Sequence, residues 1–346
     1  MAKSDVHIGD AVRIAPNELV FITPQAAKDI YLSQEKNLES FVQVGYDALD
    51  TGDGGIAGET DPVKHREIAK KLAPAFSTRN FKAKEVAVHK HIDLFIQRMK
   101  EFGAGEGAEL QRWSDWLALD LSADLTYNRE MGQMRDMKDS ILLSAILKLN
   151  LFVTLSQITR KFRLLSPLMY LAIPPSVWFL MPRLIKMNTE DVMMRIDRRG
   201  KTDHLDYFEQ LIPADKPAPE NKKELYHLEN ISYFAAARSP RFFAEPLKFR
   251  PERWLSSNHP RFNPKFTDDN LRASKPFSQG PRGCPGGAIT LAVLRLFAAK
   301  VLWQFDLEAA PGQDDLSFNK DFKFLTFWER PPFWVRFKPV QRANDE

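Results

Sequence analysis

The sequence predicts a mainly α-helical protein with a small β part, and three observations lead to this fold class. Long stretches carry apolar residues at helical spacing. The clearest such stripe is formed by Leu110, Trp113, Trp116, Leu117, Leu121 and Leu125. Strand-like patterns are confined to short stretches near the two ends, at residues 12–22 and 322–327. Residues 238–282 hold many prolines and little periodicity, which indicates a long irregular connector.

The elements follow in order along the chain. Residues 12–22 predict two short strands around the Pro16-Asn17 turn, and Thr23 with Pro24 predicts the capped start of a helix. Further helices are expected at residues 62–76, 83–102, 108–128, within 137–200, at 223–233 and at 288–305. Polar or glycine-rich composition predicts surface loops at residues 47–61 and 213–222.

The composition is that of an ordinary globular protein. The chain has 346 residues, of which 44% are hydrophobic and 27% charged, enough to bury a sizeable core. Its net charge of +4 is spread without a long basic run, so no nucleic-acid partner is expected. The first seven residues are polar and show neither a signal peptide nor an N-terminal anchor. We predict one domain, 1–346.

The chain contains a single cysteine, Cys284. An internal disulfide is therefore excluded, and a reducing compartment is the natural interpretation. One cysteine without other ligands cannot build a zinc or iron–sulfur site. Without further context, a buried and inert thiol is the commonest role of such a residue.

The surroundings of Cys284 change that interpretation. Residues 277–286 contain three glycines and two prolines, which predicts a tight loop just before a long apolar helix. The N-terminus of a helix favours a thiolate, and the thiolate is the form that binds metals. Arg282 supplies a fixed positive charge suited to a carboxylate, and Phe277 is placed to cover the sulfur.

These ten residues match the pattern FxxGxRxCxG at all five specified positions, and they resemble the heme-binding signature of the cytochrome P-450 family. The resemblance implies heme as cofactor, with Cys284 as its axial thiolate ligand. It implies that Arg282 holds a heme propionate and that Phe277, Gly280 and Gly286 shape the ligand loop. The implied activity is insertion of one oxygen atom from O2 into an apolar small molecule, with electrons from an NADPH-dependent reductase. A structural cysteine remains the alternative.

The resemblance covers residues 9–233 and 238–338 and is closest to fungal secondary-metabolism members. Residues 238–254 resemble the family's connector, whose Pro-Glu-Arg element is found at Pro251-Glu252-Arg253. His65 falls where the family places an aromatic or histidine residue that reaches a propionate, although a solvated surface histidine is the alternative. Ala69 falls where an arginine is usual, and Lys70 is a possible substitute.

Two family motifs are absent from the sequence. The central helix lacks the acid-threonine pair that serves oxygen activation. No Glu-x-x-Arg sequence is found between that helix and the Pro251-Glu252-Arg253 element, where the family places it, so the ExxR helix is missing. The sequence therefore predicts an incomplete fold with one internal deletion, placed between Tyr233 and Phe234. Arg253 would lose its usual partners, so it is expected to be exposed or locally rearranged. A catalytically inactive, membrane-associated remnant with weak or no heme binding is the alternative function.

Residues 164–181 contain no charged side chain and are flanked by basic residues. Their length reaches the lower limit for a membrane span, but Pro174-Pro175 disfavours a regular spanning helix. By resemblance, this stretch forms the lip of the substrate channel and touches the membrane; ordinary core and a true span are the alternatives. The implied location is the cytoplasmic face of the endoplasmic reticulum membrane.

Overall fold

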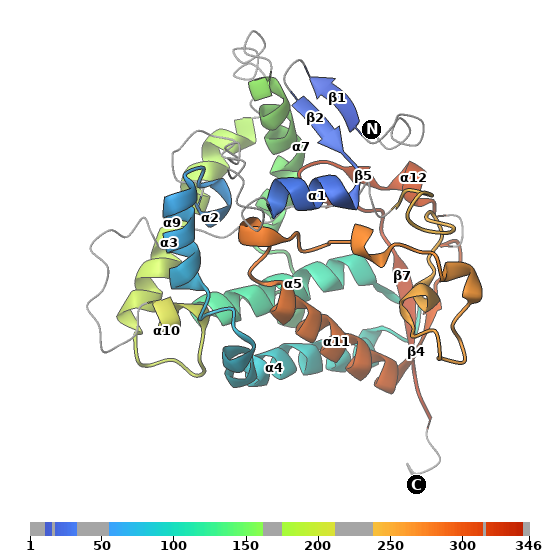
Figure 1. Ribbon diagram of the computed structural model, residues 1–346. Helices are drawn as coiled ribbons and strands as arrows, with labels where there is room; N and C mark the ends of the chain where they lie inside the picture. The colour runs from blue at the N-terminus through green and yellow to red at the C-terminus, as the bar shows by residue number, and fades with distance from the viewer. Residues whose placement is uncertain are drawn as a thin grey trace. The chain divides into compact units, whose positions relative to one another are not determined.

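The computed structural model describes residues 11–15, 18–32, 55–161, 175–211, 238–313 and 316–341. The chain divides into two compact units, each assembled from separate stretches of sequence. Within the described residues, helices predominate and the strands form three small antiparallel sheets (Figure 1). The predicted class, mainly α with a small β part, is confirmed. The predicted loop at 213–222 and helix at 223–233 lie outside the described residues.

The first unit comprises residues 1–45, 53–69 and 227–287. Its regular elements begin with β1 (Ala11–Ala15), β2 (Glu18–Phe21), α1 (Pro24–Tyr31), α2 (Gly55–Gly58) and most of α3 (Pro62–Leu72). β1 and β2 pair antiparallel, as predicted. The Thr23 hydroxyl accepts a hydrogen bond from the Ala26 amide at 3.1 Å, so the predicted helix cap is confirmed. The predicted loop at 47–61 contains the single turn of α2.

The connector, residues 238–286, belongs to the first unit and contains neither an α-helix nor a strand. Its regular pieces are four 3-10 turns: η4 (Pro251–Trp254), η5 (Pro264–Phe266), η6 (Leu271–Ala273) and η7 (Gly280–Arg282). A proline at the first or second position starts three of them, because its fixed φ suits such a turn and its missing N–H is not needed there. The irregular connector predicted from the sequence is confirmed.

The second unit, residues 46–52, 70–226 and 288–346, contains most of the helices. They are α4 (Thr78–Phe102), α5 (Leu110–Tyr127), α6 (Gln133–Asp136), α7 (Ile141–Lys161), α9 (Pro175–Asp197), α10 (Tyr207–Leu211) and α11 (Gly287–Gln304). α4 begins five residues earlier than predicted because the Ser77 hydroxyl accepts a hydrogen bond from Asn80 and caps it. α5 ends at Tyr127, and its cap residue, Asn128, takes the left-handed conformation typical of a helix C-terminus.

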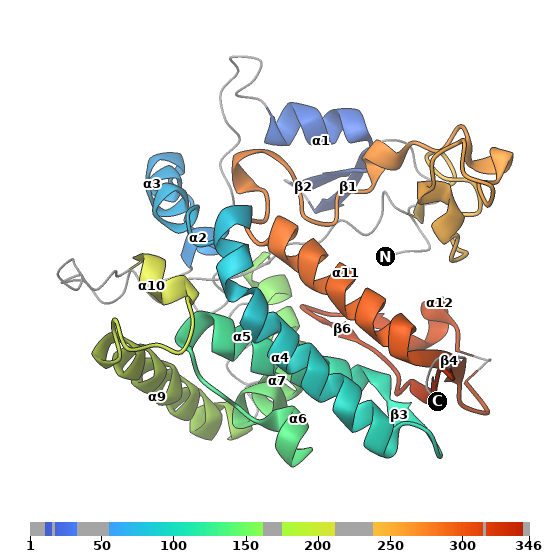
Figure 2. The ribbon, with the colours of Figure 1, turned by 90° about the horizontal axis from the view of Figure 1, so that it is seen from below.

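The main core lies among α4, α5, α11 and the C-terminal strands (Figure 2). Phe95 of α4 is fully buried and meets Trp113, Phe297 and Phe337 edge-on, with ring centroids 5.0 to 6.4 Å apart. Such edge-to-face contacts add to the stabilisation that comes from burial alone. The predicted apolar stripe of α5 is buried in this core from Trp113 onward, so its assignment to packing is confirmed.

The strands of the second unit come mainly from the end of the chain, as predicted. They are β3 (Ala108–Glu109), β4 (Phe305–Ala309), β5 (Lys323–Phe324), β6 (Trp328–Glu329) and β7 (Trp334–Pro339), with the short helix α12 (Phe318–Asp321) between β4 and β5. β7 pairs antiparallel with both β3 and β4. Gly107 has φ +98°, and a Cβ atom there would lie 2.8 Å from the Val335 carbonyl oxygen, so β3 can approach β7 only with glycine at this position.

Two buried charged groups in the second unit have partners from distant parts of the sequence. The Asp124 carboxylate contacts His91 Nε2 at 2.8 Å and His204 Nε2 at 2.7 Å. Arg195 has a fully buried side chain and donates hydrogen bonds to Asp206 and Glu209. Both groups obey the rule that buried charges are paired, and neither was predicted.

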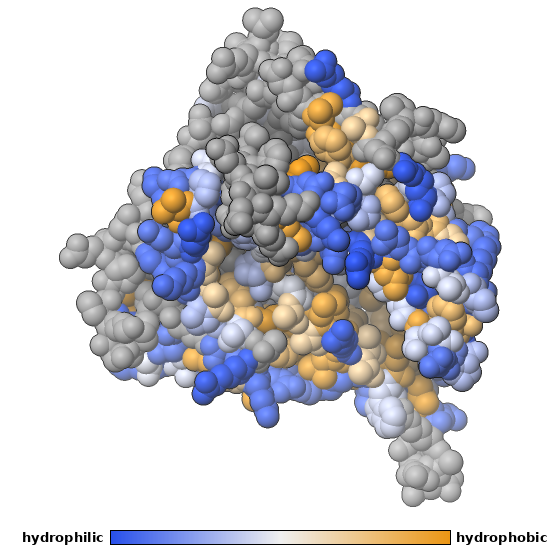
Figure 3. Space-filling view, viewed as in Figure 1, coloured by the Kyte–Doolittle hydropathy of each residue, from blue (hydrophilic) through white to orange (hydrophobic). Residues whose placement is uncertain are grey.

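Helix α11 combines an apolar sequence with extensive exposure. Of its 18 residues, only Gly287, Ile289 and Val301 are buried. The exposed large apolar side chains are Leu291, Leu294, Leu302 and Trp303. In Figure 3, apolar surface gathers at the place where Figure 1 draws α11. One side of α11 therefore packs in the core and another side carries apolar residues that the described residues do not cover.

By length and composition, α11 is the one helix among the described residues that meets the requirements for crossing a membrane. Val301 and Phe297 nevertheless contribute to the core of the second unit, and Lys300 forms an ion pair with Asp93 of α4. We therefore assign α11 to packing within the protein.

Candidate functional site

Cys284 lies where the sequence places it, three residues before the start of α11. Its backbone N–H donates to the Phe277 carbonyl at 2.8 Å, and the Gly283 N–H donates to the Gly280 carbonyl at 2.9 Å. These two bonds fold residues 277–284 into a closed loop that delivers the thiol to the N-terminal end of the helix. The Cys284 residue is partly exposed.

The glycines of this loop have different roles. Gly280 has φ +73°, and a Cβ atom there would lie 2.1 Å from the Tyr31 carbonyl oxygen, so glycine is required for both reasons. Gly286 lies in the turn before α11 and does not adopt a positive φ. Gly287 was not singled out from the sequence, yet a Cβ atom there would meet the Phe277 ring at 3.0 Å. The Phe277 ring thus packs against the first residue of α11, and its role in covering the sulfur stays a prediction.

Arg282 and His65 are brought into the same region of the first unit. Arg282 Nη1 donates to the Glu59 carbonyl at 2.6 Å, which ties the ligand loop to the segment that leads into α3. His65 is buried in α3, so its interpretation as a solvated surface residue is wrong. Burial lowers the pKa of His65, and the positive charge of Arg282 lowers it further. Lys70, the possible substitute for the family's arginine, is exposed, and its role stays untested.

Arg253 departs from expectation. It is buried, whereas the loss of its usual partners predicted exposure or rearrangement. Its Nη1 donates to the Asp269 carboxylate at 2.7 Å, and its Nη2 donates to the Ala244 carbonyl at 2.7 Å. Its guanidinium group also lies over the Phe243 and Phe266 rings, at 5.2 and 4.9 Å from their centroids. Of the two alternatives, exposure of Arg253 is therefore wrong, because the connector itself provides an acidic partner, whereas a local rearrangement stays a prediction.

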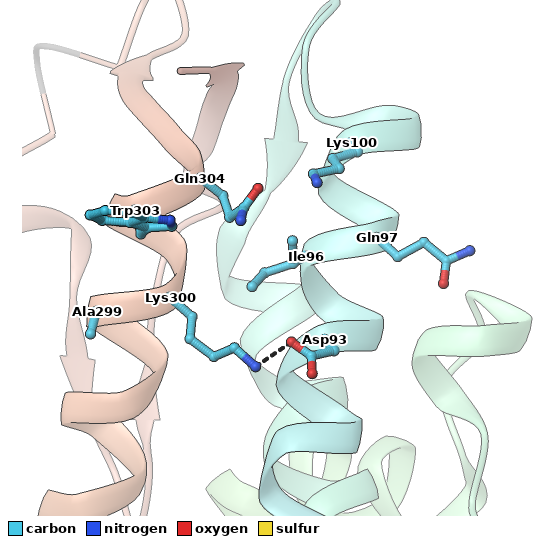
Figure 4. Close-up of a pocket in the computed structure, with 8 residues that line it drawn as sticks. All are labelled: Asp93, Ile96, Gln97, Lys100, Ala299, Lys300, Trp303 and Gln304. Carbon is cyan, nitrogen blue, oxygen red and sulfur yellow. Dashed lines mark hydrogen bonds and ion pairs between the residues drawn. The ribbon is translucent and has the colours of Figure 1, made fainter. Parts of the chain in front are cut away.

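An open cavity of about 580 Å³ lies between α4 and α11 of the second unit (Figure 4). Its lining is mixed, and Lys300 and Gln304 point from α11 toward α4, where Lys300 pairs with Asp93. The lining contains no residue of the 277–286 loop. The cavity is open rather than enclosed, so we do not assign it to the site.

Comparison with known proteins agrees with the resemblance seen in the sequence. Residues 228–332 match the family described as Cytochrome P450. The chain is 34% identical to the cytochrome P450 monooxygenase TwmD of Talaromyces wortmannii, over 96% of this chain and 84% of that protein. It is 25% identical to the cytochrome P450 monooxygenase btcC of Colletotrichum orbiculare, over 97% of this chain and 83% of that protein.

The chain belongs to the cytochrome P450 family. A third relative, the cytochrome P450 monooxygenase BOA3 of Botryotinia fuckeliana, is 24% identical over 97% of this chain and 85% of that protein. These three alignments extend over 432 to 436 residues, whereas the chain has 346. They therefore open gaps within this chain, and the P450 relatives carry internal residues that it lacks. The place of the deletion, between Tyr233 and Phe234, stays a prediction.

Heme is the cofactor of the P450 family, and the described site suits it chemically. The chain's one thiol lies three residues before the start of α11 and is partly exposed. A guanidinium and a buried imidazole of lowered pKa lie nearby, and both can donate to a carboxylate. The roles of the individual residues remain proposals.

Proposed function

We propose that Cys284 binds the heme iron as a thiolate and that the ancestral activity of the chain is oxygenation of an apolar small molecule in fungal secondary metabolism. The observation that carries the proposal is the loop closed by the hydrogen bond from Cys284 N–H to the Phe277 carbonyl. Heme supplies the oxygen chemistry of the family when it is bound. The chain's own contribution is to hold the iron, the propionates and the apolar surroundings in place.

Arg282 and His65 are proposed to hold the heme propionates. The lowered pKa of His65 keeps its imidazole neutral at pH 7, so it can donate one hydrogen bond without adding a second positive charge beside Arg282. Arg282 keeps its charge at any accessible pH and can donate to a carboxylate from a planar fork. Phe277, Gly280 and Gly286 are proposed to shape the loop. The proton-delivering acid-threonine pair of the family is absent, so no residue of this chain is proposed for that step.

The partners proposed for this function are O2, an apolar substrate and an NADPH-dependent reductase. A membrane surface is proposed as a further partner, at the cytoplasmic face of the endoplasmic reticulum. In the described part of the 164–181 stretch, Trp178 and Phe179 at the start of α9 are 68% and 82% exposed. Large aromatic side chains are favourable at the membrane interface, which supports contact at this point.

The alternative is a catalytically inactive remnant that binds heme weakly or not at all. It is favoured by a specific observation, the uncovered apolar side of α11, together with the gaps that the relatives' alignments open in this chain. Loss of a segment that lay against α11 would leave that side exposed. The two functions differ in heme affinity and turnover, and both are measurable.

The test of the ligand is a hemin titration of the purified chain and of Cys284→Ala. The wild-type chain should show the red-shifted Soret band of a thiolate-ligated, reduced carbon monoxide complex, and Cys284→Ala should not. The matched variant Arg282→Gln should keep the band but lose heme about tenfold faster, because one charge-assisted hydrogen bond is lost. An unchanged band in Cys284→Ala would exclude Cys284 as the ligand.

A further inference from the structure

The connector is held together around one buried ion pair, Arg253 with Asp269. The two side chains are only 8% and 2% exposed, so neither charge is solvated by bulk water. Asp269 uses both carboxylate oxygens, because Oδ1 accepts the Ala244 N–H at 2.6 Å while Oδ2 accepts from Arg253. The next residue, Asn270, donates its N–H to the Phe242 carbonyl at 2.7 Å. Residues 242–244 and 253 are thereby fastened to residues 269–270.

We propose that Asp269 is a positioning residue for the Cys284 loop, supplying within the connector the carboxylate that keeps Arg253 buried and the loop in register. No sequence pattern relates Asp269 to Arg253, sixteen residues before it. The inference adds to the proposed function, since Cys284 is the ligand there, but its test does not require heme.

Between Asp269 and the thiol, the chain is folded into successive turns by short-range hydrogen bonds. Ala273 N–H donates to the Asn270 carbonyl at 2.9 Å, and Ser274 N–H donates to the Leu271 carbonyl at 3.3 Å. Ser278 N–H then donates to the Lys275 carbonyl at 3.0 Å, and the Cys284–Phe277 bond closes the loop. Because only one peptide link, Ser274 to Lys275, separates the two groups of turns, we infer that a shift at Asp269 would displace the start of the ligand loop.

Removal of the Asp269 charge should disturb the connector more than the loss of the two hydrogen bonds of Asp269 alone would. Arg253 would then be a buried cation between the Phe243 and Phe266 rings with two backbone carbonyls but no counter-ion. A buried charge deprived of its partner is strongly destabilising, so the guanidinium would move toward water. Because Arg253 also bonds the Ala244 and Arg250 carbonyls, that movement would open the connector.

The single thiol provides a direct probe of this effect. We would measure the alkylation rate of Cys284 in the full apo chain for wild type, Asp269→Asn and Asp268→Asn. Asp268 is the exposed neighbour of Asp269, so Asp268→Asn removes the same charge without touching the ion pair. Asp269→Asn should raise the alkylation rate at least tenfold, and Asp268→Asn should leave it within twofold of wild type.

Amide hydrogen exchange separates positioning from a general loss of stability. In Asp269→Asn, exchange should accelerate at residues 242–253 and 275–284 and stay unchanged in α5, whereas a merely structural role would accelerate it throughout. Asp269→Glu should restore much of the protection. If Asp269→Asn does not fold, Arg253→Lys serves instead, because it keeps the charge but loses the guanidinium fork, and it should show the same local pattern. Equal alkylation rates in Asp269→Asn, Asp268→Asn and wild type would overturn the proposal.

The outcome is independent of the proposed function. If the wild-type chain shows no thiolate-type Soret band, heme ligation by Cys284 fails, yet the alkylation and exchange measurements still decide the role of Asp269. If the band is present and Asp269→Asn behaves as wild type, the positioning role fails and heme ligation stands.

Discussion

The connector and helix α11 follow one another in the chain, but the buried charge of the one has partners while the apolar side chains of the other are left uncovered by the described residues. In the connector, the buried Arg253 is paired with Asp269 and with nearby carbonyls. In α11, Leu294 and Leu302 are 54% and 62% exposed although the helix is predominantly apolar. Polar groups can be satisfied by partners a few turns away, whereas an apolar helix side needs a second large surface against it. If the predicted deletion is correct, we therefore expect local order to survive it more readily than long-range packing does.

The largest expected effect concerns turnover. We predict that the 346-residue chain with a matched reductase shows little or no substrate-dependent NADPH consumption. A positioned proton donor is worth about two to four orders of magnitude in rate, and the acid-threonine pair is missing. The chain should also purify with less than one heme per molecule. Heme content and product formation would be measured on the same sample. One heme per chain, together with product formation coupled to NADPH consumption, would contradict the prediction, because the segment predicted to be missing would then be dispensable for activity.

The second prediction concerns exposed apolar side chains whose exposure need not result from the loss of a packing partner. For Trp178 and Phe179 we attribute exposure to membrane contact instead. The chain should float with liposomes, and a double substitution, Trp178→Asp with Phe179→Asp, should weaken binding by on the order of tenfold or more, since each large apolar side chain contributes about 1.5 to 3 kcal/mol when buried. The matched control is Leu294→Asp with Leu302→Asp on α11. Equal flotation of wild type and the α9 double variant would contradict membrane contact there.

The third prediction compares two adjacent residues of α11. Val301 is 3% exposed in the core, and Leu302 is 62% exposed. Val301→Ala should lower the free energy of unfolding by about 1.5 to 3 kcal/mol through lost burial and a small cavity. Leu302→Ala should change it by less than about 0.5 kcal/mol, as expected for a surface site. Urea unfolding measures both, and Leu302→Ala should also reduce binding of a hydrophobic dye. A large cost at Leu302 would mean that this side of α11 is covered after all.

Sequence patterns predicted the parts of the structure that depend on local or periodic signals. The stripe of α5, the cap at Thr23 and the irregular connector were all visible, because spacing and turn residues encode them directly. The loop around Cys284 was visible because its glycines and cysteine form a specific motif. Asp269 was not, because its pairing with Arg253 depends on how several turns add up in space. The contact of Asp124 with His91 and His204 was missed for the same reason, since it joins three distant segments.

The smallest expected effect is a difference in pH dependence between the two units. Burial and the charge of Arg282 lower the pKa of His65, so the unfolded chain binds this proton more tightly than the folded chain does. The contribution of His65 to stability is therefore lost as the pH falls below the ordinary histidine value of 6.5. His204 behaves in the opposite way. Its hydrogen bond to the Asp124 carboxylate raises its pKa, so its contribution is full below pH 6.5 and is lost as the pH rises through the raised pKa.

Removal of His65 and removal of His204 should therefore change the pH dependence of the unfolding free energy in opposite directions. The measured quantity is the slope of the unfolding free energy against pH between pH 5.5 and 8. In His65→Gln, a contribution to stability that increases with pH is removed, so the slope should be more negative than in wild type. His204→Gln removes a term that decreases with pH, so its slope should be more positive. Urea titrations at four pH values measure the difference between the two variants, and His259→Gln, in an exposed turn of the connector, is the control. If both variants change the pH slope of the unfolding free energy in the same direction, the opposite pKa shifts of His65 and His204 do not govern the pH dependence of stability.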